Sequence, residues 1–288
     1  MAAGVQGAGR GSDLADAVSA EGCRIEILHH RPRVGRMALY DSIGRSYAAF
    51  RRPDRRIASA IDAALGDAGS VVNIGAGTGS YEPSNRMVVA VEPSEVMMRQ
   101  RPADAAPCLR GRAEALPLAT ASVDAAMAVL TIHHWTDPER GLGEMARVAR
   151  KRVVLLTWVP DAEPFWLTED YFPEIVAHDR KVFPGAAALT ALLERSIGPV
   201  RMTPVAIPHD CTDGFLCAYW RRPEFYLEAA IRSGMSSFAR IDAEPGLARL
   251  RADLSSGRWA ERNGHLLALE TLDLGYRIVG CEIGGKDG

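Results

Sequence analysis

The chain has 288 residues with a formal net charge of −2 at pH 7, and 47 % of the residues are hydrophobic. This length suffices for one α/β domain with an insertion, and the dispersed basic residues argue against a nucleic-acid substrate, which would favour a basic face. No apolar run has the form of a signal peptide or the length of a membrane span, and the five cysteines include no C-x-x-C pair, so we expect a cytoplasmic protein without a membrane partner.

Apolar periodicity divides the chain into four parts. They are a mobile tail at 1–35, two covering helices within 36–66, a ligand-binding core at 67–160, and at 161–288 the remainder of the sheet with a helical substrate lid at about 209–265. Strands are predicted at 71–74, 87–91, 108–110, 125–131, 153–158, 200–208 and 276–283. Helices are predicted at 36–50, 57–65, 142–149 and 186–196, followed by a helical stretch at 215–262.

This alternation of strands and helices favours an α/β fold with a doubly wound, mostly parallel sheet. Ligands of such sheets bind at the carboxyl ends of the strands. The helical stretch at 215–262 falls between the sixth and the seventh predicted strand, so we expect a helical insertion there.

The most informative motif is V-V-N-I-G-A-G-T-G-S-Y-E at residues 71–82. Gly75, Gly77 and Gly79 follow a short apolar strand, and glycine allows a sharp turn in which a ligand approaches the bare backbone. The spacing G-x-G-x-G differs from the dinucleotide pattern G-x-G-x-x-G. No Lys-Ser/Thr pair follows the glycines, which excludes a phosphate-binding P-loop.

A second apolar run, at 87–91, ends in Glu92, and Pro93 and Ser94 follow it. A carboxylate at the tip of the second strand of a β-α-β unit can accept hydrogen bonds from both ribose hydroxyls of a nucleotide. Met97 then stands where its side chain could lie flat on an adenine.

Together, the glycine loop and Glu92 resemble the first two motifs of the class I S-adenosylmethionine-dependent methyltransferases. The segments G-R-A-E-A-L-P at 111–117, S-V-D at 122–124 and L-T-I-H-H-W at 130–135 are similar to later motifs of the type 11 branch, which includes the ubiquinone/menaquinone C-methyltransferases. Motif order and spacing match over roughly residues 38–160. The resemblance implies a Rossmann-like seven-stranded sheet with an N-terminal helical cover, S-adenosyl-L-methionine as cofactor and S-adenosyl-L-homocysteine as product.

The resemblance also implies which residues bind the cofactor. The glycine loop and Asn73 would hold its methionine end, Glu92 its ribose, and Met97 and Ala113 its adenine. The full set that it implies is Tyr40, Tyr47, Asn73, Gly75, Ala76, Gly77, Thr78, Gly79, Glu92, Pro93, Ser94, Met97, Ala113, Glu114, Leu130 and Thr131.

At two positions the sequence departs from the pattern of the relatives, and for two tyrosines another interpretation is open. Asn73 stands where many relatives have Asp, so it lacks the charge that would pair with the cofactor's ammonium. Arg112 stands where relatives often have Asp for the adenine amine, and Glu114 would accept from that amine instead. Tyr40 and Tyr47 could equally be core aromatics of an amphipathic helix.

Four residues are candidates for a general base. His133 and His134 follow the fourth predicted strand, and a histidine there can accept a proton near neutral pH. Alternation along a strand places residues 130, 132 and 134 on one face, which favours His134 over His133; a structural role is the alternative for either one. His209 and Asp210 follow the sixth predicted strand, where a loop with a helix cap is the alternative. A second cluster at metal-ligand spacing is missing, so no metal is expected.

These residues predict a methyltransferase that acts on a small molecule by O- or C-methylation, through proximity and a general base. Two alternatives remain open at this point: use of the cofactor without methyl transfer, as in a cyclase or a ligand-binding protein, and an NAD-dependent oxidoreductase. An apolar or aromatic substrate is favoured by the aromatic side chains after residue 160, which are Phe165, Trp166, Tyr171, Phe172, Tyr219, Trp220, Phe225 and Tyr226.

Overall fold

The computed structural model describes the backbone of residues 15–20 and 23–28 and all atoms of residues 51–284. The helix predicted at 36–50, with Tyr40 and Tyr47, lies outside these residues. Within the predicted tail, β1 (Ala15–Ala20) and β2 (Cys23–Leu28) pair in antiparallel fashion, which the sequence pattern did not predict.

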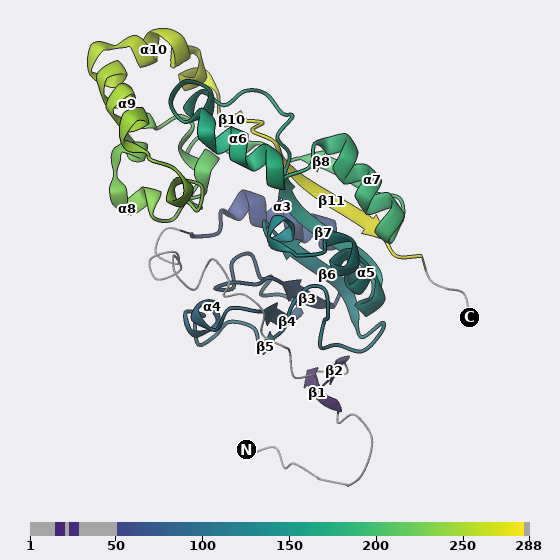
Figure 1. The fold of residues 1–288 in the computed structure, drawn as a ribbon. Helices are drawn as coiled ribbons and strands as arrows, with labels where there is room; N and C mark the ends of the chain where they lie inside the picture. Colours follow the sequence, from purple (N-terminus) through teal and green to yellow (C-terminus); the bar gives the residue numbers. More distant parts are fainter. Residues whose placement is uncertain (1–14, 21–22, 29–50, 285–288) are drawn as a thin grey trace.

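Seven strands of the described chain form one sheet in the order β5–β4–β3–β6–β7–β11–β8 (Figure 1). All neighbouring pairs from β5 to β7 are parallel, whereas β11 runs antiparallel to both β7 and β8. The chain order reverses on either side of β3, which is the switch point where ligands of doubly wound sheets bind. The bounds are β3 Ser70–Ile74, β4 Met87–Glu92, β5 Cys108–Arg110, β6 Val123–Val129, β7 Ala149–Trp158, β8 Arg201–Pro204 and β11 Tyr276–Glu282. The doubly wound, mostly parallel fold is therefore confirmed.

Side chains of the sheet alternate between two cores, as the two-residue period of a strand requires. Val71 and Leu156 face the core that contains α3 and the helical insertion. Val72 and Leu155 face the opposite core, which α5 and α7 cover. The helices are α3 Arg55–Leu65, α4 Glu95–Arg99, α5 Pro138–Val148, α6 Pro173–Val182, α7 Ala186–Ile197, α8 Ala229–Arg232, α9 Glu244–Ser256 and α10 Arg258–Asn263.

Helix α3 shows how the sequence sets an element and its position. Asp54 caps its start, because the Asp54 side chain accepts from Arg56 N at 2.9 Å. Ile57, Ile61 and Leu65 recur every four residues and are all buried against the sheet. Helix α3 thereby packs on β7 and β11.

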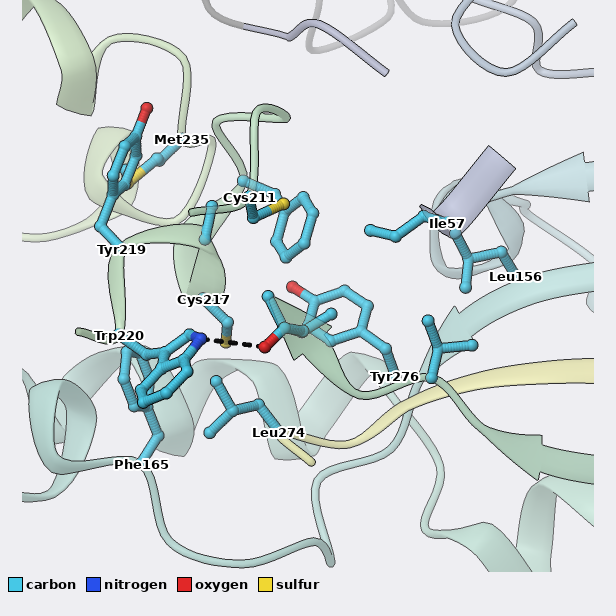
Figure 2. Packing of buried hydrophobic residues seen from close by; sticks show 14 of the residues in the cluster. Ile57, Leu156, Phe165, Cys211, Cys217, Tyr219, Trp220, Met235, Leu274 and Tyr276 are labelled. Carbon is cyan, nitrogen blue, oxygen red and sulfur yellow. Dashed lines mark hydrogen bonds between the residues drawn. The ribbon is translucent and has the colours of Figure 1, made fainter. Parts of the chain in front are cut away.

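The expected helical insertion lies between β8 and β11 and forms a lobe at one end of the molecule, where α8, α9 and α10 gather (Figure 1). Its core is aromatic: Trp220 and Tyr226 are fully buried. Figure 2 shows this packing around Cys217 and Tyr276, with Trp220 Nε1 donating to Ile207 O at 3.0 Å. The lobe is therefore packed on the sheet through apolar side chains, in addition to being covalently continuous with β8 and β11.

Two predicted elements differ in the structure. The strand predicted at 200–208 is divided into β8 and the short β9 (Ile207–Pro208), which pairs with β10 (Thr271–Leu272) in a separate sheet. The helical stretch predicted at 215–262 consists of short helices and 3-10 turns. Pro223 and Pro245 each start a new helical segment, and Gly257, at a φ of +83°, ends α9.

The described chain also contains four 3-10 turns in the insertion, a 3-10 turn after β6 at Ile132–His134 and a π-helical turn before α6. The 3-10 turns of the insertion are Leu216–Tyr219, Pro223–Leu227, Phe238–Arg240 and Gly264–Ala268, and the π-helical turn is Leu167–Tyr171. None of the described helices combines the length and the apolar content needed to cross a bilayer.

Candidate active site

The glycine loop follows β3 at the switch point of the sheet, and its three glycines all have positive φ. The angle is +65° at Gly75, +53° at Gly77 and +96° at Gly79, a region that other residues rarely adopt. A Cβ added to Gly75 would overlap Thr131 Oγ1. The glycines are thus required both for the turn and for close approach to the segment that follows β6.

Glu92 ends β4 next to this loop. Its side chain is buried, Oε2 accepts from Gly77 N at 2.9 Å, and Oε1 accepts from Ser94 N at 2.8 Å. These two bonds fix the orientation of the carboxylate at the end of β4. Ser94 caps α4, where its Oγ accepts from Met97 N at 3.3 Å, and Pro93 is exposed.

Asn73 contacts a buried ion pair. Its Nδ2 donates to Glu82 Oε1 at 3.1 Å, and Arg101 Nη2 lies 2.8 Å from both carboxylate oxygens of Glu82. Arg101 Nη1 also donates to Gly77 O at 3.3 Å. Sequence reasoning missed Glu82 and Arg101, which tie the glycine loop to the segment between β4 and β5.

Met97 and Ala113 are buried, as side chains that border a cofactor pocket should be. Met97 Cε lies 3.4 Å from the position of a Cβ added to Gly77, so it borders the glycine loop. Glu114 has a different partner from the predicted adenine amine. Its Oε1 accepts from Thr136 N at 2.7 Å, so Glu114 holds the loop before α5.

The segment after β6 corrects the prediction for His134. Strand β6 ends at Val129, because Leu130 adopts a φ of +51° and its N–H donates to Leu156 O at 2.7 Å. Thr131 is buried, and residues Ile132–His134 form a 3-10 turn. The two-residue alternation therefore does not extend to the histidines, and the argument that favoured His134 is wrong.

A cavity opens beyond the carboxyl ends of β6 and β7, between the sheet, α6 and the insertion. Leu130 and His133 belong to its lining, and His134 does not. Much of the lining is apolar, with side chains that include Trp158, Phe165, Phe183, Phe215, Leu274 and Tyr276. The charged side chains around it are Arg51, Glu163, Glu169, Asp179, Arg180 and Arg240.

His133 is the cavity histidine. Its Nδ1 is buried and has no hydrogen-bond partner within the described part of the chain, and its ring lies 4.3 Å from the ring of Phe183. Burial, together with the nearby His134 and Arg240, holds the pKa of His133 well below its usual value. Burial also lowers the pKa of His134 to about 4. Both imidazoles are therefore uncharged at neutral pH.

The structure does not place the other two candidate bases at the cavity. His209 is partly exposed, with Nε2 3.4 Å from Glu270 Oε2. Asp210 is 57 % exposed and its carboxylate binds Arg56 Nη1 at 2.7 Å. Neither belongs to the cavity lining, so the prediction that they act as bases is not supported.

The loop that contains them has a structural function instead. Asp213 is buried, pairs with Arg51, and accepts from Tyr81 Oη at 2.8 Å. Thr212 N donates to Asp54 Oδ2 at 3.1 Å. This network connects the insertion to the start of α3, through Asp54, and to Tyr81, which follows the glycine loop.

Asp179 was not among the predicted residues, although the sequence contains a signal for it. Val176, Asp179, Arg180 and Phe183 follow the spacing i, i+3, i+4, i+7 of one helix face, and all four line the cavity. A helix-face analysis of the aromatic-rich segment after β7 would have found this residue.

The groups at the carboxyl ends of β3 and β4 have the chemistry that S-adenosylmethionine requires. Gly75–Gly79 expose mostly backbone, since Ala76 and Thr78 carry the only side chains of that stretch. At Gly75 a side chain would overlap Thr131. Glu92 offers a fixed carboxylate at the end of β4, and Met97 an apolar surface next to it. No group of three metal-ligating side chains is present among the described residues.

Comparisons with known proteins agree with this geometry. Residues 72–157 match a family described as a methyltransferase domain. A crystal structure of a putative methyltransferase from an antibiotic biosynthesis pathway of Anabaena variabilis is 38 % identical, with a TM-score of 0.75, and the match covers 80 % of this chain and 98 % of that one. No curated protein matches this chain.

Two other solved structures are more distant. A methyltransferase from Thermotoga maritima, described as a possible histamine N-methyltransferase, is 26 % identical with a TM-score of 0.45, over 59 % of this chain and 82 % of that one. The [4+2]-cyclase SpnF is 14 % identical with a TM-score of 0.51, over 86 % and 94 %. The match to a methyltransferase family and the Anabaena variabilis structure favour a methyltransferase over an NAD-dependent oxidoreductase. The chain belongs to the class I S-adenosylmethionine-dependent methyltransferases, and S-adenosyl-L-methionine is its cofactor.

Proposed function

We propose that this protein methylates a small apolar or aromatic molecule, by O- or C-methylation, in the cavity beyond β6 and β7. The observation that supports the proposal is the lining of that cavity, in which aromatic side chains surround a few polar groups. The cavity begins at Leu130 and His133, next to the segment that packs on the glycine loop. An acceptor in it would therefore lie close to a cofactor held by that loop.

The residues of the chain would act mainly by binding and orientation. Gly75–Gly79, Asn73, Glu92 and Met97 would hold the cofactor, which supplies an electrophilic methyl group when bound. Trp158, Phe183 and Tyr276 would orient the acceptor and keep water out, which favours an in-line attack. The insertion, with the predicted lid at about 209–265, would cover the acceptor.

His133 is suited to a hydrogen bond with the acceptor rather than to holding a proton. Its Nδ1 is buried without a partner among the described residues, which costs free energy unless a ligand supplies one. Because its pKa is well below the usual value, it would hold a proton poorly at neutral pH.

The test is product analysis with purified protein, S-adenosylmethionine carrying a deuterated methyl group, and a small-molecule extract of the source cells. We expect equal amounts of S-adenosylhomocysteine and of one methylated, deuterium-labelled product. A rearranged product without the label would instead support use of the cofactor without methyl transfer. Failure of S-adenosylhomocysteine to bind in calorimetry would refute the proposal.

A further inference from the structure

Helix α6 presents one face to the cavity, and Asp179 stands in the middle of that face. Val176 and Phe183 lie one turn before and one turn after Asp179 and line the same cavity. The ring of Phe183 in turn lies 4.3 Å from the ring of His133. Asp179 is thus one helical turn from a side chain that contacts the histidine in the 3-10 turn after β6.

The carboxylate of Asp179 has no hydrogen-bond or ion-pair partner among the described residues. The residue is 8 % exposed. A largely buried carboxylate without a partner is costly, and such groups gather at the functional sites of proteins. Since Asp179 lines the cavity, the missing partner is expected to come from the cavity.

The cavity offers no cation that pairs with Asp179. The charge of Arg240 lowers the pKa of Asp179, but Arg240 Nη1 lies 2.6 Å from His178 Nε2 and makes no ion pair with Asp179 among the described contacts. Arg51 is paired with Asp213. The other charged groups of the lining are Arg180 on α6 and Glu163 and Glu169 on the segment before it, and all three are exposed.

We propose that Asp179 accepts the proton of the reacting hydroxyl group of the acceptor, which makes the acceptor an apolar or aromatic alcohol or phenol. This inference rests on the proposed function and narrows it to O-methylation. As the hydroxyl oxygen bonds to the methyl carbon, the carbon–sulfur bond breaks, its electron pair stays on sulfur, and the hydroxyl proton passes to a carboxylate oxygen of Asp179.

The electrostatics of Asp179 suit this function better than those of the two histidines. Burial raises the pKa of Asp179 to about 6, although Arg240 opposes the rise. A general base works best when its pKa is near the working pH. The pKa of His134 is lowered to about 4, and that of His133 is also lowered, so both are weaker bases.

The test compares two probes on the protein saturated with S-adenosylhomocysteine. The probes are 2-naphthol, which carries a hydroxyl donor, and 2-methoxynaphthalene, in which a methyl group replaces the proton. Affinities are measured by equilibrium dialysis for the wild type, Asp179→Asn, Asp179→Leu and the control Glu174→Gln. Glu174 is an exposed carboxylate on the same helix and does not line the cavity.

We expect the wild type and Glu174→Gln to bind 2-naphthol about tenfold or more tightly than the ether, because a hydrogen bond to a charged acceptor is lost in the ether. Asp179→Leu should abolish this preference and Asp179→Asn should reduce it. Unchanged affinity for S-adenosylhomocysteine shows that each variant is folded.

The inference is overturned if the preference for 2-naphthol survives in Asp179→Leu. It is also overturned if the wild-type protein binds the ether as tightly as 2-naphthol, or binds neither probe. In each of these cases, the proposed function still stands as long as the protein binds S-adenosylhomocysteine. If S-adenosylhomocysteine itself does not bind, the proposed function fails instead.

Discussion

Asn73 donates a hydrogen bond from Nδ2 to Glu82 Oε1 at 3.1 Å, and this contact accounts for an amide at a position where related methyltransferases often have Asp. Glu82 is already a negatively charged side chain in this region, and it forms an ion pair with the buried Arg101. A second carboxylate at position 73 would therefore face the first one. The departure seen in the sequence is matched by a partner nine residues further along the chain.

Asn73→Asp should accordingly lower the free energy of unfolding, by about 1–3 kcal/mol, since a buried donor is replaced by a like charge. Urea denaturation at pH 7.5 measures the change. The double variant Asn73→Asp/Glu82→Gln exchanges donor and acceptor and restores a single carboxylate, so it should recover part of the loss. Equal stability of Asn73→Asp and wild type would contradict the importance of this contact.

Glu92→Ala should weaken the binding of S-adenosylhomocysteine. The carboxylate accepts from Gly77 N and Ser94 N, so its removal should loosen the glycine loop. It also removes the proposed contact with the ribose. Hydrogen bonds to a charged group contribute about 1.5–3 kcal/mol each, which predicts a loss of about 100-fold or more in calorimetry. Glu95→Ala, at an exposed carboxylate three residues away, is the control and should change the affinity little.

The sequence places the candidate cofactor residues near one another because they are local in the chain. The glycines directly follow β3, Glu92 ends β4, and Met97 lies in α4 just after it, so these residues come from a single short stretch of the chain around two paired strands. The same locality explains the correct prediction of β3, β4 and β5. The contact of Glu114 with Thr136 N could not be predicted in this way, because it depends on how the loop before α5 folds back.

The substrate side is less predictable because it is assembled from distant segments. His134 was favoured by extending a strand through Leu130, and a single positive φ there ends the strand. His209 and Asp210 were chosen for their chemistry, but contacts of their loop with Arg56 and Asp54 hold it at the surface. Such contacts, 154 and 158 residues apart in sequence, leave no periodic signal.

Tyr81→Phe should reduce stability through the network that joins the insertion to the sheet. Tyr81 Oη donates to Asp213 Oδ2 at 2.8 Å, and both residues are buried, so the loss of the hydroxyl leaves an acceptor short of a partner. The expected cost is about 1–3 kcal/mol in the free energy of unfolding. Tyr219→Phe is the control: its hydroxyl makes no hydrogen bond with the described residues, and its removal should change stability by less than about 0.5 kcal/mol.

Thermal or urea unfolding of Tyr81→Phe, Tyr219→Phe and wild type at one pH separates the two effects. Equal losses in both variants would show that the phenol ring environment, and not the bond to Asp213, sets the stability.

Asp179→Asn should stabilise the protein above pH 6, which is the opposite of the usual effect of a core substitution. The pKa of Asp179 is raised from 3.8 to about 6 by burial, so the folded protein holds this proton more tightly than the unfolded chain does. The free energy of unfolding must then fall as the pH rises from about 4 to about 6, by roughly 3 kcal/mol at 1.36 kcal/mol per pKa unit.

Urea denaturation of wild type, Asp179→Asn and Glu174→Gln between pH 4 and pH 8 tests this sign. Asp179→Asn should lose the decrease between about pH 4 and pH 6 and be more stable than wild type at pH 7.5, whereas Glu174→Gln should keep the wild-type slope. Arg240 is the charge that opposes the rise in the pKa, so Arg240→Gln should make the decrease larger and extend it to higher pH. A less stable Asp179→Asn at pH 7.5 would mean that the carboxylate contributes to folding, and the argument for keeping an unpaired charge in the cavity for catalysis would lose its basis.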